Sequence, residues 1–307
     1  MIRKPTAADL ALIVLMVSIW SSAFVAIKVA VVETGPLWLV VGRVLFGFLV
    51  LLPWTLWRGI VLPATAREWL YVWLISVLSA FLPFFLISWA QQTLDAGLTA
   101  LLMGTGPFLA LILSHFTTQD DRLSISKLVA VGFGFAGVAI VVGPDAFGGI
   151  NGGMTGGIDG GLAAPIAILA ACSCYAVSGI LVRRVESVPP TRLTSLVLGL
   201  SLLMLIPVVM LSGAEPPDMP SSQAMFALIW LGVGPTGCAY IMRYHLIRTV
   251  GYSYVALGIN LLPALGVLFG AVLLGETVSA SVLLALVLVL TGLAIARLGA
   301  PRARVDL

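Results

Sequence analysis

The chain consists of long apolar runs separated by short polar segments, and this pattern limits its fold more than any other feature. The first run extends from Leu10 to Val32 and contains a single charged residue, Lys28. About 20 apolar residues in a helix cover the roughly 30 Å hydrocarbon core of a bilayer. Only 9% of the 307 residues are charged, against roughly 25% in soluble domains. The sequence therefore predicts an all-α membrane protein.

Polar, proline and glycine residues divide the apolar runs into ten expected transmembrane helices. The first run is too long for a signal peptide and lacks a small-residue cleavage site, so we expect it to be the first span. The expected spans cover residues 9–32, 36–57, 69–91, 97–116, 125–143, 162–182, 191–212, 223–245, 252–275 and 279–298.

The longest segment between runs, residues 144–161, is rich in glycine and has no Lys or Arg. It predicts a flexible periplasmic linker between a first five-span repeat at 1–143 and a second at 162–307. A phosphate-binding glycine loop would need a lysine and a strand-to-helix transition. Neither is found here, so this alternative is disfavoured.

The basic residues predict the orientation of the chain. If the N-terminus is cytoplasmic, every Lys and Arg except Lys28 and Arg43 falls at the cytoplasmic edge, while Glu33, Glu215 and Glu276 fall in outer loops. An excess of Lys and Arg is typical of cytoplasmic loops. We therefore expect a multi-pass protein of a bacterial inner (plasma) membrane, with both termini in the cytoplasm.

The two halves of the sequence resemble each other weakly. At one constant offset, Ala100 falls on Ala256 and Pro107 falls on Pro263. Five spans is an odd number, so the second half is expected to run upside down relative to the first. Inverted repeats are typical of secondary transporters, which bind substrate between the halves near the midplane.

Several loose motifs follow one another in a specific order. They are residues 20–24, Arg43, residues 96–100 with Pro107, residues 252–256 with Pro263, and residues 274–276. Over nearly its whole length the chain resembles the drug/metabolite transporter (DMT) superfamily of the EamA-domain type, and within it the YddG-like amino-acid exporters. The resemblance implies ten helices around a central cavity, with spans 5 and 10 peripheral and spans 3–4 and 8–9 acting as moving hairpins.

Two basic residues lie inside expected spans. A charge within a span is costly and usually faces a cavity or a partner. Arg43 is therefore expected to face a cavity or to bridge helices, although its side chain can also reach the interface. Lys28 lies nearer to a span end, and extension of its side chain to the interface is the favoured interpretation.

No Asp or Glu lies in the middle of an expected span. A proton-coupled exporter of cations usually needs such a carboxylate. The sequence therefore favours gradient-driven transport of an anionic or zwitterionic solute that would suit Arg43. No set of catalytic groups is found at membrane depth either, so we expect no enzyme activity. No metal site and no cofactor are expected.

The candidate substrate site is a set of aromatic and weakly polar residues at depth, together with Arg43. Asn260 is equally expected to contact substrate or to bond another helix, and many of the aromatic residues belong to interface belts. Pro107 and Pro263 are the expected hinges, with static kinks as the alternative. The expected binding residues are Trp20, Ser21, Ser22, Phe24, Arg43, Ser88, Trp89, Gln92, Thr99, Met103, Tyr175, Ser178, Tyr240, Tyr252 and Asn260.

The function that these observations favour is secondary transport. We expect an exporter of small metabolites, in particular neutral or aromatic amino acids, that works by alternating access without ATP. The alternatives are export of sugar phosphates, purines or drugs, and a membrane sensor or scaffold that transports nothing. The expected partners are a small-molecule substrate and the lipid bilayer, with no nucleic acid. The protein is expected to be a monomer, with an oligomer left open.

Overall fold

The computed structural model describes residues 3–117, 124–151 and 162–298, and within these ranges the chain is helical and contains no strand. In lipid, a helix satisfies its own backbone hydrogen bonds, which explains why the apolar runs take this form. The elements are α1 (Ala7–Arg58), α2 (Ala66–Ser76), the π-helix η1 (Val77–Phe81), α3 (Leu82–Ala90), α4 (Ala96–Met103), α5 (Gly106–Thr117), α6 (Ile125–Asn151), α7 (Ala163–Val182), α8 (Pro190–Ser212), α9 (Ser222–Leu231), the π-helix η2 (Gly232–Cys238), α10 (Ala239–Val250), α11 (Tyr252–Ile259), α12 (Leu262–Leu274) and α13 (Ala280–Leu298).

Seven helical stretches in the described ranges are long and apolar enough to cross a membrane. Two shorter apolar helices, Leu262–Leu274 and Ala280–Ala296, follow them. The seven stretches are Ala7–Arg58, Ala66–Ala90, Ala96–Leu113, Ile125–Gly143, Ala163–Val182, Pro190–Ser212 and Ser222–Val250.

The first stretch, α1, joins two of the expected spans into one element of 52 residues. At 1.5 Å per residue it is far longer than a bilayer is thick. The helix breaks at Gly35, whose φ of 68° and ψ of 164° are not helical. Gly35 tolerates this conformation because it has no side chain, and Pro36 disfavours a helical residue before it. The chain therefore turns at Gly35, within α1.

Four other interruptions fall at similar places in the two parts of the chain. The π-helices η1 and η2 interrupt α2–α3 and α9–α10, and Pro235 lies within η2. A proline removes one helical hydrogen bond, and a π turn accommodates the loss. The chain also leaves the helix at Gly104–Thr105, between α4 and α5, and at Asn260–Leu261, between α11 and α12.

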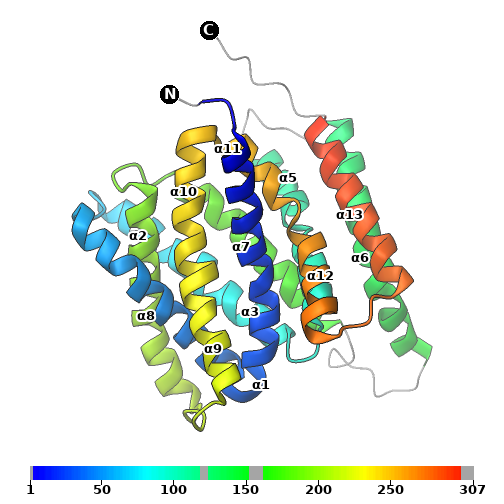
Figure 1. The fold of residues 1–307 in the computed structure, drawn as a ribbon, viewed down its shortest axis with the longest axis horizontal. Helices are drawn as coiled ribbons and strands as arrows, with labels where there is room; N and C mark the ends of the chain where they lie inside the picture. The colour runs from blue at the N-terminus through cyan, green and yellow to red at the C-terminus, as the bar shows by residue number, and fades with distance from the viewer. Residues whose placement is uncertain (1–2, 118–123, 152–161, 299–307) are drawn as a thin grey trace.

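Helices α6 and α13 lie against each other at one side of the bundle (Figure 1). This is the peripheral position that the family resemblance implies for the fifth and tenth spans. Helix α6 continues to Asn151, so residues 144–151 are helical where the sequence predicts a flexible linker. Glycine lowers helix propensity but does not end a helix that is already formed. Residues 152–161 of that linker lie outside the described part of the chain.

The start of α1 and the end of α13 lie at the same end of the bundle (Figure 1). The helix ends and loops there contain Arg3, Arg58, Arg67, Arg183, Arg184 and Arg248, and we call it the basic end. Glu33, Asp95, Glu215, Asp218 and Glu276 lie at the opposite end, which we call the acidic end.

Candidate substrate site

Arg43 lies inside the bundle, on the part of α1 that follows Gly35, and only 8% of its surface is exposed. Its Nε donates a hydrogen bond to Thr236 Oγ1 at 3.1 Å. Its guanidinium carbon lies 3.7 Å from the centre of the Phe84 ring, which is a close cation–π contact. Neither Nη atom is hydrogen-bonded to any residue in the described ranges. Most donors of this buried cation are therefore available to a ligand.

A close approach between α1 and η2 places Thr236 beside Arg43. A Cβ on Gly232 would lie 2.8 Å from Gly47 N, and a Cβ on Gly47 would lie 2.6 Å from Thr236 Cγ2. Only glycine fits at such contacts. Thr236 Oγ1 also donates to the Leu231 carbonyl at 2.8 Å, which fixes its lone pairs toward the guanidinium.

Two tyrosines from different helices lie within electrostatic range of Arg43, namely Tyr175 on α7 and Tyr240 on α10. Trp20 packs edge-on against Tyr240, with ring centres 6.1 Å apart. Its indole N–H donates to the Pro235 carbonyl at 3.0 Å. Trp20, Arg43, Phe84, Tyr175, Thr236 and Tyr240 together are called the Arg43 cluster below. In it the cation lies over the Phe84 ring, with the two tyrosines nearby and Trp20 packed on one of them.

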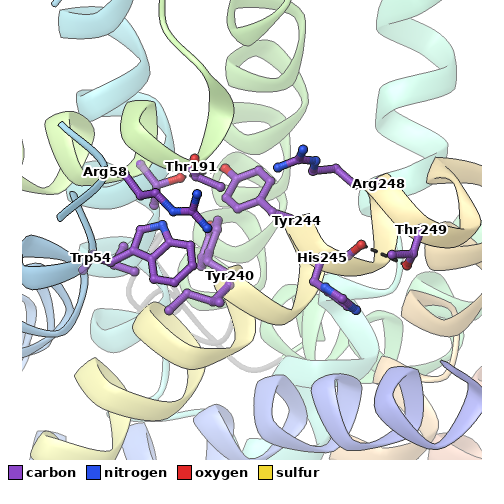
Figure 2. A pocket seen from close by; sticks show the side chains of 11 residues that line it. Trp54, Arg58, Thr191, Tyr240, Tyr244, His245, Arg248 and Thr249 are labelled. Atoms are coloured by element: carbon purple, nitrogen blue, oxygen red, sulfur yellow. Dashed lines mark hydrogen bonds between the residues drawn. The ribbon is translucent and has the colours of Figure 1, made fainter. Parts of the chain in front are cut away.

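The larger cavity, at the basic end, has a volume of about 410 Å³. Figure 2 shows aromatic, hydroxyl and basic side chains around it, and Tyr240 of the Arg43 cluster forms part of its wall. This volume lies in the range of small-molecule sites. The lining residues are Leu51, Trp54, Arg58, Thr191, Thr194, Tyr240, Ile241, Tyr244, His245, Arg248 and Thr249.

A smaller cavity of about 200 Å³ lies between α4–α5 and α7. Its lining is largely apolar and includes Tyr175, the other tyrosine near Arg43. The Arg43 cluster thus has one tyrosine in the wall of each cavity. The lining residues are Met103, Gly106, Pro107, Ala110, Cys172, Tyr175 and Ala176.

The acidic end is held by polar contacts between elements. Glu276, in the turn after α12, accepts hydrogen bonds from Ala96 N at 2.6 Å and Gly97 N at 2.8 Å. These are unpaired N–H groups of the first turn of α4, where a carboxylate is favourable. Below this contact α4 and α12 pack tightly, since a Cβ on Gly266 would overlap Ala100 Cβ.

Lys28 also contributes to the acidic end. Its ammonium donates to the Leu94 carbonyl at 2.7 Å and to the Gln91 carbonyl at 3.2 Å, in the turn after α3. Lys28 thus extends to the turn at the acidic end, as the sequence leads us to expect, and there it bonds carbonyl groups that a helix end leaves unpaired. Glu33 accepts from Ser221 N at 2.6 Å and from Ser221 Oγ at 2.7 Å.

The structure brings four of the expected binding residues together in the Arg43 cluster, namely Trp20, Arg43, Tyr175 and Tyr240. Four hydroxyl groups are bonded to backbone carbonyls instead. Ser21, Ser22, Ser178 and Thr99 donate to Leu262, Ile19, Tyr175 and Asp95 respectively. Such hydroxyl groups are less available to a substrate.

The other expected residues are placed differently. Phe24 is buried, Met103 lines the smaller cavity, and Ser88 is buried with its hydroxyl unpaired among the described residues. Trp89 is 39% exposed and Gln92 is exposed, and within the described residues neither side chain has a hydrogen bond or ring contact with the Arg43 cluster. An apolar or weakly polar residue in a span carries no signal in the sequence for the direction in which it points.

The last four expected residues lie at or near helix breaks. Asn260 occupies the turn between α11 and α12, partly buried and without a hydrogen bond to the described chain. Pro107 borders the smaller cavity, and Pro263 is buried in the first turn of α12. Tyr252 begins α11, and its side chain lies outside what the structure describes.

Sequence reasoning missed Phe84 and Thr236, which contact Arg43 directly. Neither residue type is unusual in a span. The available signal was the run Gly234-Pro235-Thr236-Gly237, which places a hydroxyl among small residues and a proline at membrane depth. Such runs are tolerated where a helix lines a cavity or is buried in protein.

Comparisons with known proteins agree with this architecture. The profile of the EamA-like transporter family matches residues 8–143 and, a second time, residues 162–298. An uncharacterized transporter of Archaeoglobus fulgidus is 23% identical over 267 residues, which cover 86% of this chain and 89% of that protein. The uncharacterized transporter YoaV of Bacillus subtilis is 21% identical over 68% of each chain. A known crystal structure, 21% identical, aligns with 96% of this chain and all of its own with a TM-score of 0.65, which indicates a common fold.

Proposed function

This chain belongs to the EamA-like transporter family, and we propose that it exports small zwitterionic metabolites, in particular neutral and aromatic amino acids, by alternating access without ATP. The family and the two transporter relatives support a multi-pass membrane transporter. The substrate, the direction and the mechanism are our proposal, and so is the narrower likeness to the YddG-like exporters.

The Arg43 cluster supports this substrate class. Arg43 is buried, has no carboxylate bonded to it in the described chain, and keeps both Nη atoms free of bonds. A buried cation is costly unless it is paired. A substrate carboxylate that accepts a two-pronged hydrogen bond from the Nη atoms would supply that pairing. The rings of Trp20, Tyr175 and Tyr240 would then face the rest of the solute.

Ten spans in two inverted halves are the arrangement that we propose for this transport. Gly35 divides α1 into two helical parts, each of which is long enough to cross a bilayer. The interruptions η1 and η2 occur at matching places in the two halves, as do the breaks after α4 and after α11. Two similar halves with opposite orientations provide two similar conformations, one open to each side.

The basic end is cytoplasmic in this proposal, because loops rich in Lys and Arg are retained inside. The cavity of about 410 Å³ then opens toward the cytoplasm, and the contacts of the acidic end close the periplasmic side. All carboxylates in the described ranges lie near helix ends. We therefore propose transport down a gradient, with a monomer as the working unit.

Counterflow in liposomes tests the proposal. Purified protein is reconstituted in vesicles loaded with unlabelled L-phenylalanine, and the uptake of labelled L-phenylalanine is followed without ATP. We expect transient accumulation, inhibition by neutral and aromatic amino acids, and little inhibition by cationic dyes. If a sugar phosphate or a purine inhibits uptake better than every amino acid, the proposed substrate class is wrong and that compound class takes its place. The absence of flux for the whole panel would favour a sensor or scaffold.

Two variants of Arg43 examine the observation on which the proposal rests. In Arg43→Gln the cation is lost, so we expect counterflow to fall at least tenfold. In Arg43→Lys the charge remains without the planar pair of donors, so we expect an intermediate loss. Equal loss for L-phenylalanine and for its amide, which has no carboxylate, would show that Arg43 acts on folding and not on the carboxylate.

A further inference from the structure

The larger cavity has a basic, carboxylate-free lining that the Arg43 cluster does not account for. Arg58, His245 and Arg248 contribute to its wall, and none of the lining residues is acidic. Figure 2 shows Arg58 and Arg248 on different sides of Tyr244, so the two guanidinium groups border the same space. The lining therefore concentrates positive charge in a cavity large enough for a small solute.

The two guanidinium groups are free to bind. Arg58 lies over the indole rings of Trp54 and Trp57, at 5.1 Å and 4.7 Å from the ring centres. Neither Arg58 nor Arg248 donates a side-chain hydrogen bond or forms an ion pair within the described ranges. Stacking on indole rings orients a guanidinium without using its donors. Most hydrogen-bond donors of Arg58 and Arg248 in the cavity wall are thus unused.

Two carboxylates at the basic end, Glu68 and Asp9, are occupied by other partners, and Glu186 of the described chain does not line the cavity. Glu68 accepts hydrogen bonds from Glu186 N, Ser187 N and Ser187 Oγ, and Asp9 pairs with Arg3 at 2.6 Å. None of these contacts involves a residue of the cavity wall. Among the described residues, no carboxylate in the cavity wall offsets the positive charge of the lining.

Aromatic rings form the other part of the lining. Trp54 lies on α1, while Tyr240 and Tyr244 lie on α10 with ring centres 6.4 Å apart. Tyr244 shares a hydrogen bond of 2.6 Å with Thr194 on α8, which fixes this ring in the wall. A flat apolar group fits between such rings, while the two arginines reach an acidic group at the mouth.

We propose that this cavity is a second binding site, a vestibule that holds the carboxylate of a solute at Arg58 and Arg248 and its apolar part among Trp54, Tyr240 and Tyr244. The site is distinct from Arg43, and Tyr240 belongs to both. A solute in the vestibule therefore lies next to the cluster that it occupies afterwards. This inference rests on the proposed function for the identity of the solute, but the electrostatic part is independent of transport.

The first test measures the charge of the vestibule with cysteine reagents. Thr249→Cys places a thiol in the wall, and its modification is followed by mass spectrometry of its peptide, so the native cysteines stay in place. We expect an anionic methanethiosulfonate (sulfonatoethyl) to react faster than a cationic one (trimethylammoniumethyl). One charge about 7 Å away in water changes such a rate about threefold, so Arg248→Gln is expected to lower the anionic rate and raise the cationic rate by up to that amount. Arg58→Gln is expected to act in the same direction with a smaller effect, because Arg58 lies across the cavity from Thr249 (Figure 2).

Ser212→Cys at the exposed acidic end is the matched control, and there the two arginine variants change neither rate. The arginine side chains form no bonds that folding needs in the described chain, so both variants are expected to fold. Equal rates for the two reagents at Thr249→Cys, or rates that do not change in the arginine variants, would overturn the proposal.

The second test asks what occupies the vestibule. In phosphatidylcholine nanodiscs, L-phenylalanine is expected to protect Thr249→Cys from modification at least threefold, whereas L-phenylalaninamide is not. Protection of Thr249→Cys by L-phenylalanine is expected to persist in Arg43→Gln, because Arg43 lies outside the vestibule. It is expected to disappear in Arg248→Gln, because Arg248 holds the carboxylate there. The opposite result is that anionic phosphatidylglycerol blocks modification of the thiol while L-phenylalanine does not. This result would identify the cavity as a lipid headgroup site and overturn the proposal of a solute vestibule.

The two tests also separate this inference from the proposed function. If liposomes show no flux while L-phenylalanine still protects Thr249→Cys, the vestibule stands and the transport proposal fails. If flux is present but protection is absent, the vestibule fails and the transport proposal stands.

Discussion

The two ends of the bundle contain similar helix ends but treat their charged side chains differently. At the acidic end, Glu276 and Lys28 reach backbone groups of neighbouring elements, and the tight packing of α4 on α12 closes the space below. At the basic end, Arg58 and Arg248 make no such bonds in the described chain and border a cavity of about 410 Å³. The comparison teaches that backbone contacts of charged side chains do not close an end by themselves, because Glu68 makes such contacts at the basic end as well. At the acidic end they combine with tight helix packing.

This difference is the one that the proposed alternating access requires, because a carrier must close one end while the other is open. In the proposed export, the contacts at the acidic end have to break when substrate leaves there. Four sets of variants test this, and each uses the same reporter. Ser21→Cys, on α1 beside the Leu262 carbonyl, is labelled from the acidic side of oriented vesicles with an impermeant thiol reagent.

The largest effect is expected for Gly266→Val. A side chain at this position overlaps Ala100 and separates α4 from α12, and overpacking typically costs about 1–3 kcal/mol. We expect counterflow to fall more than tenfold and labelling of Ser21→Cys to rise more than tenfold. Gly132→Val on α6 is the matched control, because a Cβ there meets nothing within 4 Å. Equal behaviour of the two variants would show that this packing does not close the acidic end.

Glu276→Ala is expected to have the next largest effect. It removes two charge-assisted hydrogen bonds at the start of α4, and the loss is about 1–2 kcal/mol. Labelling of Ser21→Cys is therefore expected to rise about tenfold. In Glu276→Gln one carbonyl acceptor remains, so the labelling of Ser21→Cys is expected to rise less than in Glu276→Ala. If both variants label as slowly as the parent protein, the carboxylate does not hold the acidic end closed.

Lys28→Met is expected to open the acidic end by a smaller amount. The ammonium group bonds two carbonyls after α3 but is partly exposed, so we expect about a fivefold rise in labelling, which corresponds to about 1 kcal/mol. Lys28→Arg preserves both bonds and serves as the control. A rise of the same size in Lys28→Arg would point to altered packing instead of lost hydrogen bonds.

Glu33→Gln is expected to have the smallest effect. Its bonds to Ser221 lie at the exposed surface, where water competes for both partners. We expect labelling to change less than twofold. Glu215→Gln is the control, since no side-chain bond of Glu215 is recorded in the described chain. A tenfold rise in the labelling of Ser21→Cys in Glu33→Gln would show that the main contact closing the acidic end lies at the Gly35 turn and not at α4.

Hydrophobicity alone was sufficient for most of the helices. The predicted spans 162–182 and 191–212 match α7 and α8 to within a residue at either end, because backbone groups in lipid must bond within their own segment. The break at Gly35 falls between the predicted spans 9–32 and 36–57, whereas the extension of α6 to Asn151 and the two π-helices were not predicted. Each depends on local backbone geometry, to which a hydropathy pattern is insensitive.

The candidate site was predicted only in part. Arg43 was identified because a charge at membrane depth is rare, and Trp20, Tyr175 and Tyr240 because they are aromatic residues at depth. Thr236 was missed because its role arises from the close approach of Gly232 to α1. The partner of Lys28 was missed because helix-end carbonyls are present in every chain and only packing brings them within reach.

The sequence by itself determined that this chain is a helical membrane protein, where most of its apolar runs end, and that one arginine lies within a span without an acidic neighbour in the sequence. Composition and spacing decide these features, since they follow from the cost of polar groups in lipid. Only the tertiary structure decided that Arg43 meets Thr236 and Phe84, that Glu276 binds the start of α4, and that the open cavity lies at the basic end. These contacts join residues far apart in the chain, so they depend on how whole helices pack.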